Sequence, residues 1–351
     1  MQIRKITGFA GQPLVHFERT KDLKGNCIFI GKNLIRMILL LVAVSIVAFA
    51  LISASPIDPL QANVGQAALG SMSQEQIAKL QEYWGVGQPP VERYLSWAKD
   101  FVRGDMGTSL LYRQSVAEVI GVKLGNSLFL MIMAWVISGV LGFFLGVAAG
   151  MNRGKPVDKI IKGYSLIVAS TPAFWLALVL LMIFGVWLKV LPIGLSVPIG
   201  VEASGVTFLD RVQHAILPAV TLSITGISNI ALHTREKMID VCESDYVLFA
   251  RARGESNFSI FCHHGFRNVI LPAITLQFAA ISEIFGGSVL VEQVFSYPGL
   301  GQAAVTAGLG SDVPLLMGIA VISAVFVFGG NFIANVLYTV IDPRIRKGGQ
   351  K

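Results

Sequence analysis

Residues 244–272 read SDYVLFARARGESNFSIFCHHGFRNVILP and form a polar stretch between two long apolar segments. Ser244 or Asp245 can cap a short helix, because their side chains accept hydrogen bonds from free backbone N–H groups. Gly254 can end that helix, since glycine readily adopts the left-handed conformation that closes a helix. Arg251 and Arg253 fall in the last turn, where positive charges suit the helix dipole.

The second half of this stretch has helix signals of its own. Ser256 or Asn257 can cap another short helix, and Gly265 is expected to stop it. A connection between two membrane spans does not need two ordered, charged helices. We therefore interpret residues 244–272 as a surface on which a partner docks.

The composition indicates a membrane protein. Of the 351 residues, 54% are hydrophobic and only 14% are charged, whereas soluble domains carry about 25% charged residues. Because lipid-facing surface must be apolar, the deficit of charge predicts helices that cross a lipid bilayer. The cysteines are too few and too scattered for a disulfide framework or a metal site: Cys27, Cys242 and Cys262.

The apolar segments predict an all-α integral membrane fold with six transmembrane helices. Each segment is long enough to cross a hydrocarbon core of about 30 Å at about 1.5 Å per residue. Pro172 interrupts the third segment and should kink it, because proline removes a backbone hydrogen bond. The predicted spans cover residues 37–54, 126–149, 163–188, 215–232, 269–291 and 314–341.

The remaining segments lie outside the predicted spans. Residues 1–32 should form a loosely ordered or interfacial arm, and residues 33–351 the transmembrane domain. Residues 55–125 are polar and predict a folded extramembrane segment after the first span, with a helix over 73–83.

Lysine and arginine are unevenly distributed. Residues 1–36, 150–162, 234–268 and 342–351 together hold 20 of the chain's 28 lysines and arginines. The positive-inside rule therefore predicts that both termini and residues 244–272 lie in the cytoplasm. An even number of spans agrees with this orientation, and the net charge of +7 then requires no nucleic-acid partner.

The chain carries no motif for covalent catalysis or ATP hydrolysis. The sequence has no GxxxxGK[ST] phosphate loop, no HExxH and no GxSxG. His263 and His264 are adjacent and would point about 100° apart on a helix, which makes them a poor metal pair. We therefore predict that the chain is not an enzyme and holds no cofactor, so a gradient or a partner must drive any transport.

Four segments carry motifs in a distinctive order. Residues 244–272 contain DYV, ARARG and RNVILP, and the C-terminal residues 342–346 read DPRIR. GDMGTS stands at 104–109, and EQVFSYPGLG at 292–301. The candidate site residues of the last motif are Glu292, Pro298, Gly299 and Gly301.

Together these segments resemble the dipeptide, oligopeptide and nickel permease family of binding-protein-dependent ABC importers, over about residues 33–351. The resemblance implies a permease subunit in the cytoplasmic (inner) membrane of a bacterium or archaeon. Its cargo would be peptides or a related small solute, such as nickel or a metal chelate. The implied partners are a second homologous permease subunit, two cytoplasmic ABC ATPase subunits and an extracytoplasmic substrate-binding protein.

Within that family, residues 244–272 resemble the loop that couples the permease to the ATPases. We expect Tyr246, Phe249 and Arg251 to contact the ATPase, with Gly254 shaping the loop. The chain departs from the wider pattern at Leu248, where importers of this class carry a glutamate, and at Glu255, where an apolar residue is usual. The candidate coupling residues are Asp245, Tyr246, Phe249, Ala250, Arg251, Ala252, Arg253 and Gly254.

Polar residues inside the spans are candidates for the translocation path. A carboxylate in a span is costly, so Glu283 should face water, substrate or another helix. It either meets a cationic group of the substrate or bonds to a neighbouring helix. Asn331 and Asn335 lie four residues apart on one helix face and either join helices or line the path.

Gly142, Gly146 and Gly150 have the spacing that lets helices pack closely.

Two other functions remain open from the sequence. An ion-coupled secondary transporter would carry a coupling-ion site and often inverted repeats, and neither is evident. A membrane scaffold could use residues 244–272 to recruit a cytoplasmic partner without transport. ATPase subunits that co-purify and respond to an external binding protein would indicate the importer.

Overall fold

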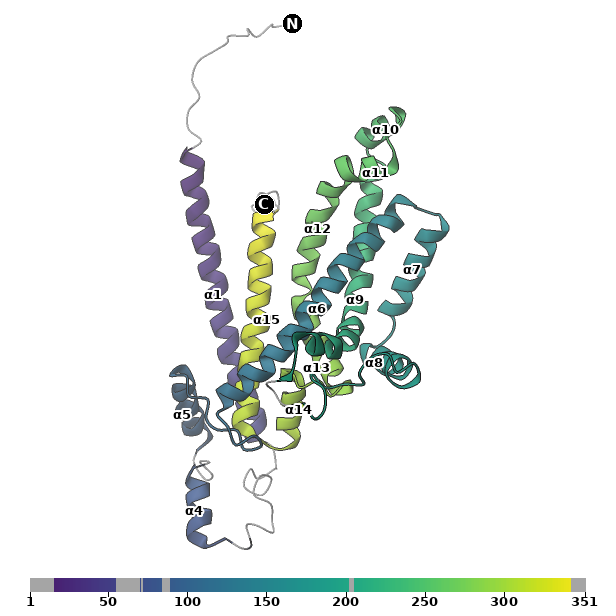
Figure 1. Cartoon of the computed structure of the whole chain (residues 1–351). Helices are drawn as coiled ribbons and strands as arrows, with labels where there is room; N and C mark the ends of the chain where they lie inside the picture. The colour runs from purple at the N-terminus through teal and green to yellow at the C-terminus, as the bar shows by residue number, and fades with distance from the viewer. Residues whose placement is uncertain (1–15, 55–69, 71, 84–88, 202–204, 342–351) are drawn as a thin grey trace. The chain divides into compact units, whose positions relative to one another are not determined.

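The computed structural model describes residues 16–54, 70, 72–83, 89–201 and 205–341 (Figure 1). Within these ranges the chain is helical apart from turns and an isolated β-bridge between Thr108 and Ser115. The predicted all-α fold is therefore confirmed for the described residues. The chain divides into two units, residues 1–43 and 44–351.

Most of helix α1 (His16–Ser53) belongs to the first unit. Residues 33–51 are long and apolar enough to cross a membrane, which agrees with the predicted first span. Side chains such as Ile35 and Leu39 are exposed, as expected of a lipid-facing helix. Residues 16–32 are helical, which excludes loose order for them and leaves the interfacial arm as a prediction. Residues 1–15 lie outside the described ranges.

The second unit continues with two short helices, α4 (Gln74–Tyr83) and α5 (Pro90–Val102). The first of them confirms the helix predicted in this region. Aromatic contacts join α5 to the end of α1, because the ring of Tyr94 lies 5.4 Å from that of Phe49. The Tyr94 hydroxyl is also 2.9 Å from the Ser45 hydroxyl.

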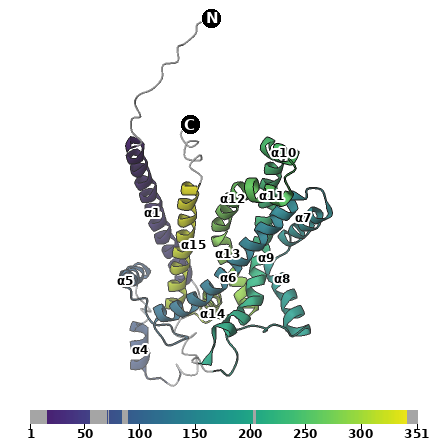
Figure 2. The same ribbon diagram turned by 45° about the horizontal axis from the view of Figure 1, so that its top comes forward.

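Helices α6 (Val116–Met151) and α9 (Phe208–Cys242) run side by side and form the centre of the second unit (Figure 1; Figure 2). A Cβ atom at Gly146 or Gly150 would lie only 2.5 or 2.6 Å from the Cβ atom of Thr234 or Met238. The two backbones can approach this closely only because these positions are glycine. Their interpretation as helix-packing residues, with Gly142, is confirmed.

The segment predicted as the third span is broken. Helix α7 (Pro156–Ala169) is followed by α8 (Ala173–Leu180) and the π-helical η1 (Leu181–Trp187), with a bend of 108° between α7 and the rest. Ser170 and Thr171 donate to the carbonyls of Leu166 and Ile167 at 2.9 and 2.8 Å. Pro172 has no N–H to extend the helix. The interruption predicted at Pro172 is confirmed, and the bend there is sharper than a kink within one continuous helix.

Four helices complete the second unit: α12 (Phe266–Ala279), α13 (Ile281–Val294), α14 (Leu300–Leu309) and α15 (Val313–Ile341). The predicted fifth span corresponds to α12 and α13, which are bent by 49° at Ala280. The sixth corresponds to α15. In the described part of the chain, four helices could cross a bilayer, or six if each bent pair counts as one span. The count of six spans therefore stays a prediction.

Candidate functional site

The residues singled out in the sequence fold as short helices at one end of the second unit, which we call the loop end (residues 244–265; Figure 1). Helix α10 (Asp245–Ala252) starts after Ser244. The Ser244 hydroxyl donates to the carbonyl of Val241 at 2.6 Å instead of capping α10. Gly254 has a φ of 84°, a left-handed conformation that glycine adopts without strain. The predicted helix and its glycine terminator are confirmed.

The next helix, α11 (Asn257–Ile260), is capped by Ser256, whose hydroxyl accepts from the Ser259 N–H at 3.3 Å. Gly265 does not stop the helix, contrary to the prediction. A π-helical segment, η3 (Phe261–Gly265), leads directly into α12. A Cβ atom at Gly265 would lie 3.1 Å from the Met238 side chain. This glycine therefore provides space for packing rather than a helix end.

Helix α10 has a buried face and an exposed face. Val247 and Ala250 are only 0% and 3% exposed, and they belong to an apolar cluster with side chains of α6, α9 and α12. On the other face, Tyr246, Leu248 and Phe249 are 47%, 52% and 64% exposed. We call these three residues the aromatic face. Large apolar side chains held out from an anchored helix are typical of a surface that a partner covers.

Charged side chains border the aromatic face. Asp245 and Arg251 are exposed on the same short helix, and Arg253, its C-cap, is also exposed. The Arg253 guanidinium lies 6.0 Å from the centre of the Phe249 ring, and the Tyr246 hydroxyl accepts from Asn268 of α12 at 3.3 Å. The structure thus gathers the candidate coupling residues on one surface, including the exposed Ala252, except for Ala250, which is buried.

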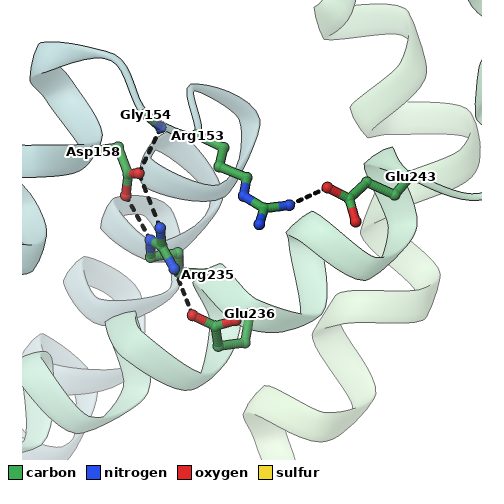
Figure 3. A network of polar contacts seen from close by, with 6 residues as sticks. All are labelled: Arg153, Gly154, Asp158, Arg235, Glu236 and Glu243. Atoms are coloured by element: carbon green, nitrogen blue, oxygen red, sulfur yellow. Dashed lines mark hydrogen bonds and ion pairs between the residues drawn. The ribbon is translucent and has the colours of Figure 1, made fainter.

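A buried ion pair supports the loop end (Figure 3). Asp158 of α7 is 3% exposed and Arg235 of α9 is 9% exposed. The guanidinium donates through Nε and Nη2 to the two carboxylate oxygens, with Nη2 2.9 Å from Oδ2. The Gly154 N–H donates to the same Oδ2 at 2.8 Å. A two-point pair with a third donor is a strong and directional contact in a buried site.

Two exposed carboxylates make further ion pairs beside this site (Figure 3). Glu236 also pairs with Arg235. Glu243, the residue before the N-cap of α10, pairs with Arg153 in the turn between α6 and α7. One ion pair therefore connects the start of α7 to α9, and another connects the turn before α7 to Glu243, between α9 and α10.

The opposite end of the second unit, which we call the far end (residues 292–315 with 105–127), is organised around Glu292. This residue is 0% exposed. Its carboxylate accepts from the Ser127 hydroxyl at 2.6 Å and from the Gln302 N–H at 3.1 Å. Ser127 in turn accepts from the Leu300 N–H at 2.7 Å. Gly299, the N-cap of α14, has no side chain, so Glu292 and Ser127 satisfy free N–H groups of α14 from outside the helix.

The glycines of the same motif make room for this carboxylate. A Cβ atom at Gly299 would lie 2.3 Å from Cδ of Glu292, and one at Gly301 would lie 2.7 Å from the backbone of Val289. The carbonyl of Pro298 accepts from the Asn126 amide at 3.0 Å. The motif therefore builds a tight junction between α6, α13 and α14.

A second buried carboxylate, Asp312, ties the far end together. It accepts from the Ser109 hydroxyl at 2.6 Å, from the Leu111 N–H at 3.0 Å and from the Leu315 N–H at 3.1 Å. The GDMGTS segment is thereby fixed to the start of α15. Asp312 is fully buried and lies outside the predicted span.

The candidate path residues lie on α13 and α15. Glu283 is exposed in the first turn of α13. Asn331 accepts from the Ser282 hydroxyl at 2.8 Å, which joins α15 to α13. The side chain of Asn335 and the DPRIR motif lie outside the described residues.

The sequence reasoning missed Asp158, Arg235, Ser127 and Asp312. Asp158 and Arg235 are charges of opposite sign beside the ends of two predicted spans, on the side that the charge count assigns to the cytoplasm. That placement was the available signal for an ion pair. Ser127 and Asp312 have only the weak signal of small polar residues at the ends of apolar segments.

In the described part of the chain, several helices are long and apolar enough to cross a bilayer, which is consistent with a multi-pass membrane protein. A family model described as "Binding-protein-dependent transport system inner membrane component" matches residues 142–347. The chain belongs to this family. It is a permease subunit of a binding-protein-dependent importer and not an enzyme, since separate ATPase subunits hydrolyse ATP in this family.

Similar proteins align over almost their whole length. The oligopeptide transport system permease protein AppB of Bacillus subtilis (strain 168) is 35% identical over 320 residues, 90% of this chain and 98% of the relative. A putative peptide transport system permease protein of Brucella abortus (strain 2308) is 31% identical over 319 residues, with the same coverage. A probable peptide ABC transporter permease protein of Sinorhizobium fredii is 31% identical over 325 residues, 91% of this chain and 99% of the relative.

Proposed function

We propose that this chain pairs with a second homologous permease and imports peptides across the cytoplasmic membrane, driven by two ATPases. The names of the relatives support peptides as the cargo; nickel or a metal chelate is the alternative cargo. The distribution of lysine and arginine supports a cytoplasmic loop end and a far end that meets the external binding protein.

The aromatic face is the observation that carries the proposed coupling role. Tyr246, Leu248 and Phe249 project from a helix whose opposite face is buried in the transmembrane part. Exposing three large apolar side chains to cytoplasm is unfavourable unless a partner covers them. In this proposal the ATPase covers them, and Arg251 and Arg253 bind acidic groups at the rim of the contact.

Coupling requires that ATP-driven closure of the ATPases favours one arrangement of the transmembrane helices over another. Movement of α10 reaches α9 through the buried cluster beneath Val247 and Ala250. Arg235 of α9 holds Asp158, so the same movement is passed to α7 and to the break that follows it. The ion pair is therefore proposed to carry coupling from the loop end to the broken helix.

A matched pair of variants tests the docking role. Leu248→Asp places a charge on the aromatic face, whereas Leu309→Asp alters an 85% exposed leucine at the end of α14. Both residues are exposed, so neither change should reduce the amount of folded protein in the membrane. We expect the ATPases to co-purify with Leu309→Asp and to be lost from Leu248→Asp. Normal ATPase recovery with Leu248→Asp would overturn the proposal.

A further inference from the structure

A pocket of about 500 Å³ lies between the first turns of α6, the start of α9 and the segment that precedes α9. Two of the residues that line it, Asn126 and Tyr297, belong to the far end. Its volume falls in the range of about 300–1,000 Å³ that is typical of sites for small organic ligands. Among the candidate coupling and path residues whose side chains the structure describes, none lines this pocket.

One side of the pocket is an apolar trough. The rings of Phe129 and Phe208 meet edge to face, with centres 5.9 Å apart and an interplanar angle of 82°. Gly121 and Gly125 form the adjacent wall, and a Cβ atom at either position would meet no atom within 4 Å. The missing side chains therefore leave open space that an apolar group of a ligand can fill.

The other side of the pocket carries a positive charge. Arg211 lies in the first turn of α9 and is exposed. Its neighbour Asp210 is engaged in the helix cap, where it accepts from the N–H and hydroxyl of Thr207 at 2.9 and 2.7 Å. Among the residues that the structure describes, no carboxylate forms an ion pair with Arg211.

Tyr297 completes the wall beside Arg211. Burial raises the pKa of the Tyr297 phenol to about 12. The phenol is therefore uncharged at neutral pH, and the net charge of the described pocket wall stays positive. An anion with an apolar body is the ligand that fits this combination, because a guanidinium binds a carboxylate through two parallel hydrogen bonds.

We propose that this pocket binds the C-terminal carboxylate of an incoming peptide at Arg211, with the last apolar side chain in the trough beside Phe129 and Phe208. The inference rests on the proposed function, because it takes the cargo to be a peptide and the far end to face outward. The pocket would hold a peptide released by the binding protein before the peptide enters the translocation path.

The test uses a photoreactive tripeptide, Ala-Ala-(4-benzoylphenylalanine), and its C-terminal amide. The complete complex of permeases and ATPases is placed in phosphatidylcholine nanodiscs without the binding protein, irradiated and mapped by mass spectrometry. We expect the free acid to label residues 116–129 or 208–211. The amide should label them at least tenfold less, since a charged hydrogen-bonded pair contributes about a factor of ten or more in binding.

Three variants separate charge from shape. Arg211→Gln should lower labelling by the free acid at least tenfold and leave labelling by the amide unchanged. Gly125→Leu should block both probes by filling the trough. Gly163→Leu, on α7, is the matched control, because a Cβ atom there also meets nothing within 4 Å; it should label like the unaltered protein.

Equal labelling by the acid and the amide, or no effect of Arg211→Gln, would overturn the inference. The inference would also be overturned if the free acid labelled the isolated binding protein but did not label the permease. A phospholipid phosphate could satisfy the same guanidinium, so the experiment is repeated in phosphatidylglycerol nanodiscs. A tenfold loss of labelling there would assign the pocket to lipid and would also overturn the inference. Failure of the proposed function would appear separately, as absent ATPase co-purification or absent ATP-dependent peptide uptake, since labelling requires no ATP.

Discussion

Buried carboxylates lie both beneath the loop end and at the far end, but they are satisfied in different ways. Beneath the loop end, Asp158 of α7 is paired with the guanidinium of Arg235 of α9. At the far end, Glu292 and Asp312 accept from hydroxyl and backbone N–H groups, and two of these N–H groups lie at the starts of α14 and α15.

This difference suggests a division of labour. Glu292 and Asp312 are hydrogen-bonded to backbone N–H groups in the first turns of α14 and α15. Moving these carboxylates would break those hydrogen bonds and unfold the starts of the two helices. A side-chain ion pair between α7 and α9 can follow two helices as they shift together. We therefore infer that the far end is a fixed junction and the loop end is the part that transmits movement.

The largest effect on stability is expected from Arg235→Met. It leaves the carboxylate of Asp158 buried and unpaired, which costs about 3–5 kcal/mol. Thermal unfolding of the purified chain in detergent measures the loss. The double variant Asp158→Leu/Arg235→Met removes both charges, and we expect it to regain most of the stability. In the complete complex with this variant, we expect the ATPases to hydrolyse ATP without matching transport. A double variant that transports normally would show that the ion pair has no coupling role.

A smaller loss is expected at the far end from Glu292→Gln. The neutral amide weakens hydrogen bonds that a carboxylate accepts, at a cost of about 2 kcal/mol. Glu283→Gln is the matched control. Because Glu283 is exposed, this variant should unfold at the same temperature as the unaltered chain. If the two variants unfolded alike, Glu292 would not be organising the junction.

The smallest effect is expected from Arg153→Ala. Its ion pair with Glu243 is more than half exposed on both sides, and exposed pairs contribute about 0–1 kcal/mol. Thermal unfolding should therefore change little, in contrast to Arg235→Met. A loss as large as that of Arg235→Met would remove the distinction between the buried and the exposed parts of the network.

Local signals in the sequence predicted the helices and several of their ends. Gly254 and Ser256 mark the boundaries of α10 and α11 because their preferences act within a few residues. Gly265 was misread for the same reason, since a glycine that packs against Met238 looks locally like a terminator. Pro172 predicted a kink, but the 108° bend also depends on how α7 and α8 pack against α9.

Contacts between distant residues were not predictable from one sequence. Asp158 and Arg235 are 77 positions apart, and Ser127 and Glu292 are 165 apart. No periodicity or spacing relates them. The loop 292–301 was recognised as a motif, but its physical basis, a buried glutamate that caps α14, became evident only from the fold. The aromatic face likewise required knowing which side of α10 is buried.

Cysteine labelling tests the central claim, that the ATPases cover the aromatic face. Cys27, Cys242 and Cys262 are replaced by serine, and a single cysteine is introduced by Phe249→Cys or, as a control, by Leu309→Cys. A water-soluble maleimide should react quickly with both variants when the permease is alone. With the ATPases bound, we predict at least tenfold slower labelling at position 249 and unchanged labelling at position 309. Equal rates at position 249 with and without the ATPases would contradict the claim.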